Sequence, residues 1–230
     1  IYQSHALDVL GFNYNHTSFS GLPEHFPGEK ILAVENMSAL ATRGYYEMPS
    51  DSIWRWPEAH EAPLKGANEY SMVSSYDHVS AYWGSTHEET WKVIKKHDFI
   101  SGIFVWTGFD YLGEPSPYPW PARSSYFGIV DLSGFPKDAY YLYQSEWTTT
   151  PVLHIFPHWN WEEGKTVDVW AYYNNADEVE LYLNDKSLGI KKKQNDDMHV
   201  MWRVKYQPGT IKAVSRKNGK AVLTRENITS

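Results

Sequence analysis

The first 148 residues contain three apolar runs, and each is long enough for a buried strand. The runs are LDVLGFNY (7–14), ILAV (31–34) and FISGIFVW (99–106). Continuous apolar runs of this length are typical of strands that are covered on both faces, as in parallel sheets. The hydrophobic pattern therefore predicts a parallel sheet in this part of the chain.

Helical patterns lie between and after these runs. Ser85 and Glu88 have the spacing of a capping box, which predicts that a helix starts there and leads to the third run. Residues 136–147 form a second helical pattern, with a proline in the first turn and aromatic residues along one stripe. Strand, helix and strand in alternation indicate an α/β layer or barrel, but a full (β/α)₈ barrel needs about 250 residues. Three strands cannot close a barrel, so this part is either a small α/β domain or the end of a larger one.

From residue 149 onwards the pattern changes to short strands separated by turns. The strands are rich in β-branched and aromatic residues, and their apolar positions partly alternate. Asn218-Gly219 is the strongest turn signal, because a type I′ hairpin needs positive φ at both central residues. Short strands with turns this closely spaced indicate a β-sandwich. The predicted strands are 167–173, 179–183, 200–206, 210–214 and 221–224.

Charge separates the same two parts. Residues 1–148 carry 9 Lys and Arg against 18 Asp and Glu, whereas residues 149–230 carry 12 against 10. The net charges are therefore −9 and +2, in agreement with −7 for the whole chain. The change falls at Thr148–Pro151, a polar stretch ending in proline that is typical of a linker. We predict two domains, 1–148 and 149–230.

Composition excludes several classes of protein. The net charge of −7 argues against nucleic acid or an anionic membrane surface as a partner. The absence of cysteine removes disulfides, a thiolate nucleophile and cysteine-ligated zinc. No apolar run approaches the about 20 residues that a membrane-spanning helix needs. The 11 Trp, 17 Tyr and 9 Phe suit stacking against sugars or large interfaces, although a tryptophan-rich core explains them equally well.

Candidate catalytic residues follow the predicted strands at their carboxyl ends, where parallel-sheet enzymes place such groups. Asn13 and Tyr14 close the first strand, Glu35 closes the second, and Trp106 and Asp110 follow the third. A carboxylate beside a phenol and a tryptophan suits glycoside cleavage, because it can attack or stabilise an oxocarbenium-like centre. The phenol can hydrogen-bond the carboxylate and hold its geometry and ionisation. A purely structural acid is an equally open interpretation of Glu35.

Four stretches of the chain resemble glycoside hydrolase family 2, in particular the bacterial β-galactosidases of Bacteroides relatives. They are LDVLGFNYN (7–15), EKILAVENMSALATRGYY (29–46), FISGIFVWTGFDYLGEPSPYPWPARSSYFGIVDLSGFPKDAYYLYQSEW (99–147) and PVLHIFPHWNW (151–161). NNADEVELYLNDKSLG (174–189) and YQPGTIKAV (206–214) are similar to the immunoglobulin-like module that follows the barrel in these enzymes. The resemblance implies an α/β plus all-β chain: strands six to eight of a TIM (β/α)₈ barrel, followed by an immunoglobulin-like β-sandwich.

The resemblance also implies roles for the candidate residues. Glu35 falls on the nucleophile position, and Trp106 on the tryptophan that lines the sugar subsite. Tyr14 resembles the tyrosine that hydrogen-bonds the nucleophile, while Asn13 and Asp110 are expected near the substrate. For Asp110 a structural role is the favoured interpretation, and a contact with a substrate hydroxyl is the alternative. The family's general acid/base, a Glu at the end of strand four, is expected before Ile1, so this chain would carry one carboxyl group of the catalytic pair.

The function implied is that of a retaining exo-β-glycosidase that hydrolyses terminal β-D-galactosides through a covalent glycosyl-enzyme. β-Glucuronidase or β-mannosidase activity on the same scaffold stays an alternative, as does a non-catalytic carbohydrate-binding or spacer module. A glucuronidase should place cations in its subsite, and the nearest to the motif loops are Arg43, Arg55 and Arg123. A β-galactoside or oligosaccharide is the expected partner, with no cofactor, metal, nucleic acid or membrane, in the periplasm or outside a bacterial cell.

Two loops carry further aromatic and basic residues. They are Trp54-Arg55-Trp56 and Trp120-Pro121-Ala122-Arg123. Either loop could line the sugar subsites, and packing within the loop explains them at least as well.

Overall fold

The computed structural model describes residues 6–55 and 72–230, and its internal contacts divide the chain into two units. The first unit contains the described residues of Ile1–Thr42 and Ile53–Phe135, and the second contains Arg43–Ser52 and Pro136–Ser230. The predicted boundary between residues 148 and 149 therefore falls inside the second unit. Arg43–Ser52 also belongs to the second unit, although the first unit surrounds it in sequence.

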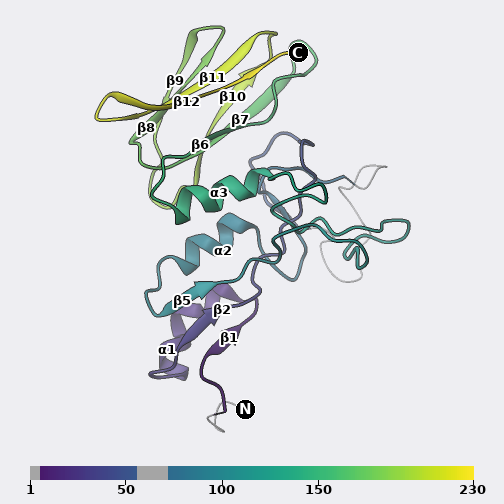
Figure 1. Ribbon diagram of the computed structural model, residues 1–230, viewed down its shortest axis with the longest axis vertical. Coiled ribbons are helices and arrows are strands. Elements are labelled where there is room, and N and C mark those ends of the chain that lie inside the picture. The colour runs from purple at the N-terminus through teal and green to yellow at the C-terminus, as the bar shows by residue number, and fades with distance from the viewer. Residues whose placement is uncertain (1–5, 56–71) are drawn as a thin grey trace. The chain divides into compact units, whose positions relative to one another are not determined.

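A three-stranded parallel sheet organises the first unit (Figure 1). It has the order β1 (Leu10–Phe12), β2 (Ile31–Ala33) and β5 (Ile100–Ile103). Leu10 pairs with Ile31, and Ile31 with Ile100, so the three strands start in register. The three predicted strands and their parallel sense are confirmed, with each strand shorter than the apolar run that predicted it.

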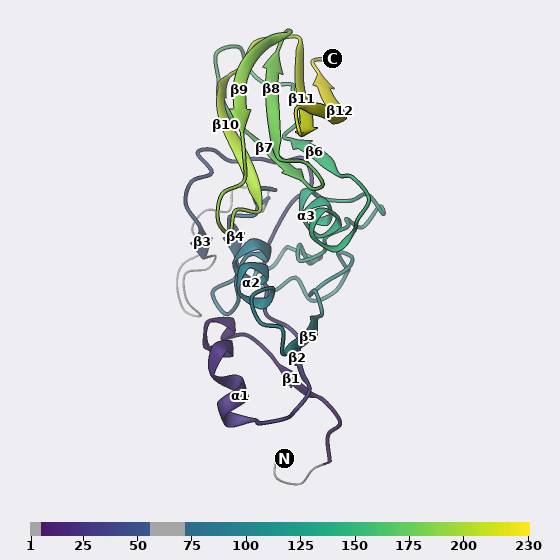
Figure 2. The same cartoon turned by 90° about the vertical axis from the view of Figure 1, so that its left-hand side faces the viewer.

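Short helices pack against this sheet through apolar side chains. Figure 2 shows α1 beside the sheet, and the core between the helices and strands is built from one cluster of buried residues. The elements are η2 (His16–Gly21), α1 (Leu22–His25) and α2 (His87–Ile94), with a separate parallel pair of β3 (Trp54–Arg55) and β4 (Val79–Ser80). The cluster consists of Phe19, Leu22, Ile31, Ala33, Ile94 and Ile100.

The capping box of α2 lies one residue later than predicted. Thr86 accepts a hydrogen bond from the Glu89 backbone N–H at 3.3 Å, and the Glu89 carboxylate accepts one from the Thr86 N–H at 2.8 Å. The prediction that Ser85 and Glu88 form this box is therefore wrong. Ser85 instead donates to the Asn36 carbonyl oxygen at 3.3 Å, a tertiary contact that its sequence neighbours do not reveal.

Asp77 holds the first turn of α2 from outside the helix. Its carboxylate accepts hydrogen bonds from the backbone N–H groups of His87 at 3.0 Å and Glu88 at 2.6 Å. Burial and the nearby Glu88 carboxylate raise the pKa of Asp77 to about 7, and the two N–H donors only partly oppose this. The residue that supports this helix is therefore a carboxyl group that titrates near neutral pH.

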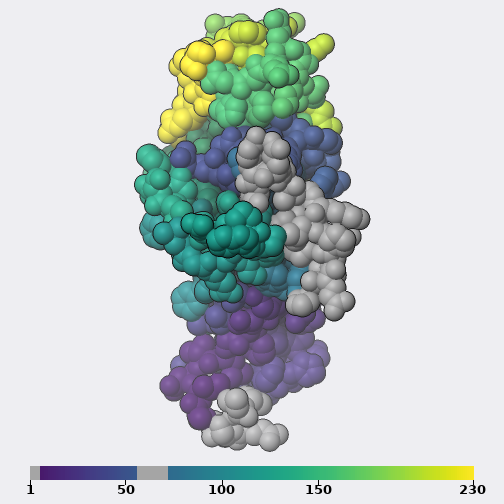
Figure 3. Space-filling model, turned by 90° about the vertical axis from the view of Figure 1, so that its right-hand side faces the viewer, coloured from purple at the N-terminus to yellow at the C-terminus, as the bar shows by residue number. Residues whose placement is uncertain are grey.

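The second unit is a sandwich of two antiparallel sheets, with α3 (Asp138–Trp147) at one end (Figure 1). Figure 3 shows the C-terminal strand, in yellow, packed directly against the green strands of the same unit. One sheet has the order β10 (His199–Lys205), β7 (Thr166–Tyr173) and β6 (Leu153–Phe156). The other has the order β12 (Lys220–Ile228), β11 (Thr210–Lys217), β8 (Glu178–Leu183) and β9 (Lys186–Lys191).

The predicted sandwich is confirmed, and each strand predicted from residue 149 onwards is present. Asn218 and Gly219 have φ values of 50° and 75°, as the type I′ hairpin between β11 and β12 requires. Two strands, β6 and β9, were not predicted. β9 is an almost fully exposed edge strand, so it lacks the apolar alternation on which the prediction depended.

The sandwich encloses one continuous core. It includes residues from both sheets and Trp159, whose indole N–H donates to the Gln207 carbonyl oxygen at 3.1 Å. Because the buried indole has a hydrogen-bond partner, it contributes apolar packing without an unpaired polar group. Within the described residues, the longest helices fall well short of the length and hydropathy that a bilayer-spanning segment requires.

Asp168, on β7, anchors the segment Arg43–Ser52 to the sandwich. The side chain is 1% exposed, and its carboxylate accepts hydrogen bonds from the Ser50 N–H and hydroxyl, both at 2.8 Å, and from Arg203 Nε at 2.7 Å. Burial opposes ionisation of Asp168, but the hydrogen bonds from Arg203 and Ser50 outweigh it and lower the pKa of this carboxyl. Arg203 also pairs with the exposed Asp51 at 2.6 Å.

Replacing Asp168 tests this anchor. We expect Asp168→Asn to lower the free energy of unfolding by about 2–4 kcal/mol, because Arg203 loses its buried partner and the Ser50 donors are imperfectly satisfied. Chemical denaturation of the protein at pH 7 measures the change. Asp51→Asn is the matched control on the same arginine, and its exposed position predicts a loss below about 1 kcal/mol. Equal effects of the two substitutions would refute the anchoring role.

The raised pKa of Asp77 predicts that the stability of the protein depends on pH. Its folded pKa of about 7 lies above the ordinary carboxyl value, so its contribution to stability is present at low pH and is lost as the pH rises towards 7. Asp77→Asn removes this loss, so the stability of the variant relative to the parent should rise by about 2 kcal/mol between pH 5 and pH 8. Denaturation curves at both pH values measure it, with the exposed Asp98→Asn as control. A difference that does not change with pH would contradict the assignment.

Candidate active site

The carboxyl ends of β1, β2 and β5 meet at one edge of the parallel sheet. The Tyr14 backbone N–H donates to the Glu35 carbonyl oxygen at 2.7 Å, just beyond the ends of β1 and β2. The Phe104 N–H donates to the Ala33 carbonyl oxygen at 3.0 Å, which continues the pairing of β2 with β5. The sheet therefore brings Tyr14 and Glu35 together and places Trp106 on the adjacent segment.

The Tyr14 hydroxyl donates a hydrogen bond to Glu35 Oε1. Both residues are partly buried, so the bond forms where water competes only weakly. Tyr14 has a φ of 52° and Asn15 a φ of 49°, in the left-handed region that non-glycine residues seldom adopt. Such strain costs about 1–3 kcal/mol per residue and is characteristic of functional sites. Here the left-handed turn is what directs the phenol towards Glu35.

The pKa of Tyr14 is raised, which favours the neutral phenol that donates the hydrogen bond. Burial and the neighbouring Glu35 carboxylate both raise the pKa of the phenol, while hydrogen bonds with Ser38 and Trp83 act in the other direction without cancelling the effect. The hydroxyl therefore keeps its proton over the neutral range. Glu35 therefore accepts its hydrogen bond from a neutral phenol.

Trp106 and Asp110 occupy the segment after β5. The Trp106 ring is 42% exposed, and the Tyr111 ring meets it edge-on with a centroid separation of 6.1 Å. Asp110 Oδ1 accepts a hydrogen bond from the Gly128 N–H at 2.8 Å, so Asp110 contributes to the conformation of the loop. Asn13 is exposed next to Tyr14. Trp106 is thus available to a ligand, whereas Asp110 has a structural contact whatever else it binds.

Three residues near Glu35 make contacts that the sequence did not predict. Asn36 is fully buried, and its Nδ2 donates to the Phe12 carbonyl oxygen at 3.2 Å, which ties the residue after Glu35 to β1. Asn36 Oδ1 is buried and has no hydrogen-bond partner among the described residues. Ser38 and Trp83 contact the Tyr14 hydroxyl. The position of Asn36 directly after Glu35 was a signal, but nothing in the sequence connects Trp83 with Tyr14.

The two aromatic and basic loops have different surroundings. Arg55 forms an ion pair with Glu89, in which Nη2 donates to both carboxylate oxygens, at 2.7 and 3.0 Å. Arg123 lies over the ring of Trp120, with the guanidinium carbon 5.0 Å from the ring centroid. Trp56 lies outside the described residues.

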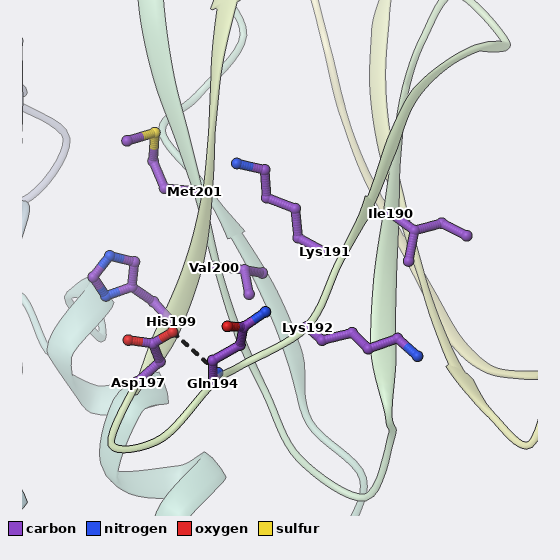
Figure 4. Close-up of a pocket in the computed structure, with 8 residues that line it drawn as sticks. All are labelled: Ile190, Lys191, Lys192, Gln194, Asp197, His199, Val200 and Met201. Carbon is purple, nitrogen blue, oxygen red and sulfur yellow. Dashed lines mark hydrogen bonds between the residues drawn. The ribbon is translucent and has the colours of Figure 1, made fainter.

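The second unit has a separate groove of about 590 Å³ between β9, the loop after it and β10 (Figure 4). The Gln194 backbone N–H donates to Asp197 Oδ2 at 3.0 Å, and Lys192 pairs with Glu178 at 3.1 Å. His199 is stacked on a buried tryptophan ring. These polar groups are engaged within the unit, and we assign no ligand to the groove. Across the described part of the chain, no cluster of three His, Asp or Glu residues is arranged to hold a metal ion.

The sequence of the chain is similar to those of known proteins. Residues 164–223 match a family described as "Domain of unknown function (DUF4982)". The beta-galactosidase BoGH2A of Bacteroides ovatus is 54% identical over the whole chain, which spans 27% of that protein. Less similar relatives include a beta-glucuronidase of Formosa agariphila, 28% identical over 84% of this chain and 19% of its own length.

Solved structures agree with these relatives. A beta-glycosidase from Bacteroides vulgatus matches 99% of this chain and 31% of its own, with a TM-score of 0.83 and 34% identity. A glycosyl hydrolase family 2 member from Bacteroides cellulosilyticus matches 97% of this chain and 26% of its own, with a TM-score of 0.65 and 26% identity. The chain thus spans about a quarter of the length of the curated relative and about a third or less of these structures. On sequence and fold together, the chain belongs to glycoside hydrolase family 2.

Proposed function

We propose that the protein carrying this chain hydrolyses terminal β-D-galactosides with retention of configuration, and that Glu35 is its nucleophile. The observation that carries the proposal is the hydrogen bond from Tyr14 to Glu35 at the carboxyl edge of the parallel strands. A carboxylate that is held by a phenol hydroxyl, with an exposed tryptophan on the neighbouring segment, has the properties of a glycosidase nucleophile. The similarity to family 2 relatives supports the same reaction class.

In this reaction Glu35 attacks the anomeric carbon as the bond to the leaving oxygen breaks. A general acid gives its proton to that oxygen, and a covalent glycosyl-enzyme results. The same group then removes a proton from water, which attacks the anomeric carbon and releases Glu35. Retaining enzymes place the two carboxyl groups about 5–5.5 Å apart. We assign only the nucleophile to this chain.

Tyr14 and Trp106 have supporting roles in this proposal. Tyr14 engages Oε1 of Glu35, so Oε2 is the oxygen left to attack the anomeric carbon. The neutral phenol steadies the carboxylate before attack and stabilises it again when the glycosyl bond breaks. The exposed ring of Trp106 would pack against the apolar face of the sugar. Asn13 and Asp110 remain candidates for contacts with sugar hydroxyls.

The proposal includes a place in the parent fold. We infer that β1, β2 and β5 are strands six, seven and eight of a (β/α)₈ barrel. Their parallel order and the gathering of Tyr14 and Glu35 at their carboxyl ends support this position, because barrel enzymes assemble active sites at that face.

Galactoside is the favoured substrate over glucuronide for two reasons. The relative that matches the whole chain at 54% identity is named a beta-galactosidase. A glucuronide carboxylate would need an unpaired cation, whereas Arg55, one of the three arginines named from the sequence, is paired with Glu89. Mannoside hydrolysis and a non-catalytic sugar-binding role have no specific observation in their favour.

Replacement of the nucleophile is the direct test. Glu35→Gln in the full-length protein should lower kcat for a β-galactoside by about 10⁴-fold or more, because an amide cannot form the glycosyl ester. Steady-state kinetics measure the loss, and circular dichroism checks that the variant is folded. Incubation with a 2-deoxy-2-fluoro-galactosyl trapping reagent should add one sugar to Glu35 of the parent protein and none to the variant. Residual turnover within tenfold of the parent would exclude Glu35 as nucleophile.

The Tyr14 hydroxyl has a weaker and separable effect. We expect Tyr14→Phe to lower kcat by about 10–10³-fold with KM nearly unchanged, because the hydrogen bond stabilises Glu35 during bond making and breaking more than it binds substrate. Tyr45→Phe is a matched control, since its hydroxyl donates to Glu47 at 2.7 Å. A rise in KM with kcat unchanged would instead assign Tyr14 to substrate binding.

A further inference from the structure

Residues 112–124 form a loop that is closed at its base. The Gly113 N–H donates to the Arg123 carbonyl oxygen at 3.0 Å, and Leu112 and Ser124 form an antiparallel bridge. One step further in, the Ser125 N–H donates to the Tyr111 carbonyl oxygen at 2.9 Å. The loop follows the carboxyl end of β5, and Glu35 follows the carboxyl end of the neighbouring parallel strand β2.

The loop is also fixed internally. It has the sequence PSPYPWP over residues 115–121, and its four prolines restrict the backbone. Tyr118 is 4% exposed, belongs to a buried cluster with Leu40 and Phe127, and packs against Tyr126 with a ring separation of 4.7 Å. Because Tyr118 is anchored, the residues that follow it have little freedom to collapse onto the surface.

Trp120 lies two residues after this anchor, and its side chain is 76% exposed. The exposed Arg123 guanidinium lies 5.0 Å from the indole centroid and stabilises the ring by a cation–π contact. Tryptophan side chains are highly buried on average, so an exposed tryptophan in a restricted loop loses the stabilisation that burial gives. The guanidinium covers one face of the indole, so the opposite face is the one that can stack on the apolar face of a pyranose.

The base of the loop is continuous with the proposed galactose subsite. Tyr111 is the last residue before the loop, and its ring meets that of Trp106 edge-on at 6.1 Å. Trp106 and Trp120 are therefore carried by one hydrogen-bonded segment. With Trp106 assigned to the galactose ring, Trp120 at the far end of the segment is left for a sugar beyond the scissile bond.

We propose that Trp120 is the stacking platform for a sugar unit on the leaving-group side, with Arg123 holding the indole from its other face. The preferred substrates are then galactosides whose aglycone is itself a sugar or an oligosaccharide. This inference rests on the proposed function and adds the class of leaving group to it.

Kinetics of the full-length protein on two substrates test the proposal. Lactose has a sugar aglycone, whereas β-D-galactosyl fluoride has a leaving group too small to reach Trp120. Trp120→Ala should lower kcat/KM for lactose by about tenfold or more and leave the fluoride within twofold. Trp120→Phe should recover part of the loss, because it restores a flat ring. Leu112→Ser is the matched control, a 75% exposed residue of the same loop, and should change neither value.

Binding separates failure of this inference from failure of the proposed function. Titration calorimetry measures the affinity for lactose without turnover, in Glu35→Gln and in the double variant Glu35→Gln, Trp120→Ala. A lower affinity of the double variant supports the stacking role of Trp120. Equal losses on lactose and fluoride, or no loss on either, would overturn it. So would a dimer of the parent protein that Trp120→Ala dissociates, since a second copy would then cover the ring. Wild-type protein that is inactive on both substrates would reject the proposed function alone.

Discussion

Parallel pairing of β1, β2 and β5 is the constraint on which the candidate site depends. Parallel strands share a direction, so the residues that follow them meet at one edge, however far apart they are in sequence. Tyr14 and Glu35 are 21 residues apart, yet the backbone bond between them extends the β1–β2 ladder and the phenol completes the contact. A change of register by one residue would turn Glu35 away from Tyr14.

Buried carboxylates outside this site show how strongly local partners decide ionisation. Asp168 has Arg203 and two Ser50 donors, and its pKa is lowered despite burial. Asp77 has only backbone donors and a neighbouring Glu88 carboxylate, and its pKa rises to about 7. The first carboxylate stabilises the fold once it is ionised, whereas the second stabilises it while it is protonated.

Exposed aromatic residues have a different explanation from the aromatic cores. Trp159 and Tyr118 are buried and hold their units together, whereas Trp106 and Trp120 are left open on one hydrogen-bonded segment. The aromatic residues therefore divide into a buried group and an exposed group. Burial within each unit accounts for one group, and the proposed binding of two adjacent sugar units accounts for the other.

The sequence by itself determined features whose cause is local. The apolar runs predicted the three parallel strands, and Asn218-Gly219 predicted its hairpin, because only a few residue types accept positive φ. The position of Glu35 directly after its strand made it a candidate before any contact was known.

Tertiary structure decided what depends on distant partners. The capping residue of α2 is Thr86, whereas the Ser85 hydroxyl donates to the Asn36 carbonyl oxygen. Asp168 joins the segment Arg43–Ser52 to the sandwich. The tertiary structure also brought Trp83 to the Tyr14 hydroxyl. The Ser85–Asn36 and Ser50–Asp168 contacts join residues that are 49 and 118 positions apart. A local sequence pattern cannot predict pairings over such separations. Their free energy arises only when the chain folds and excludes water from both partners.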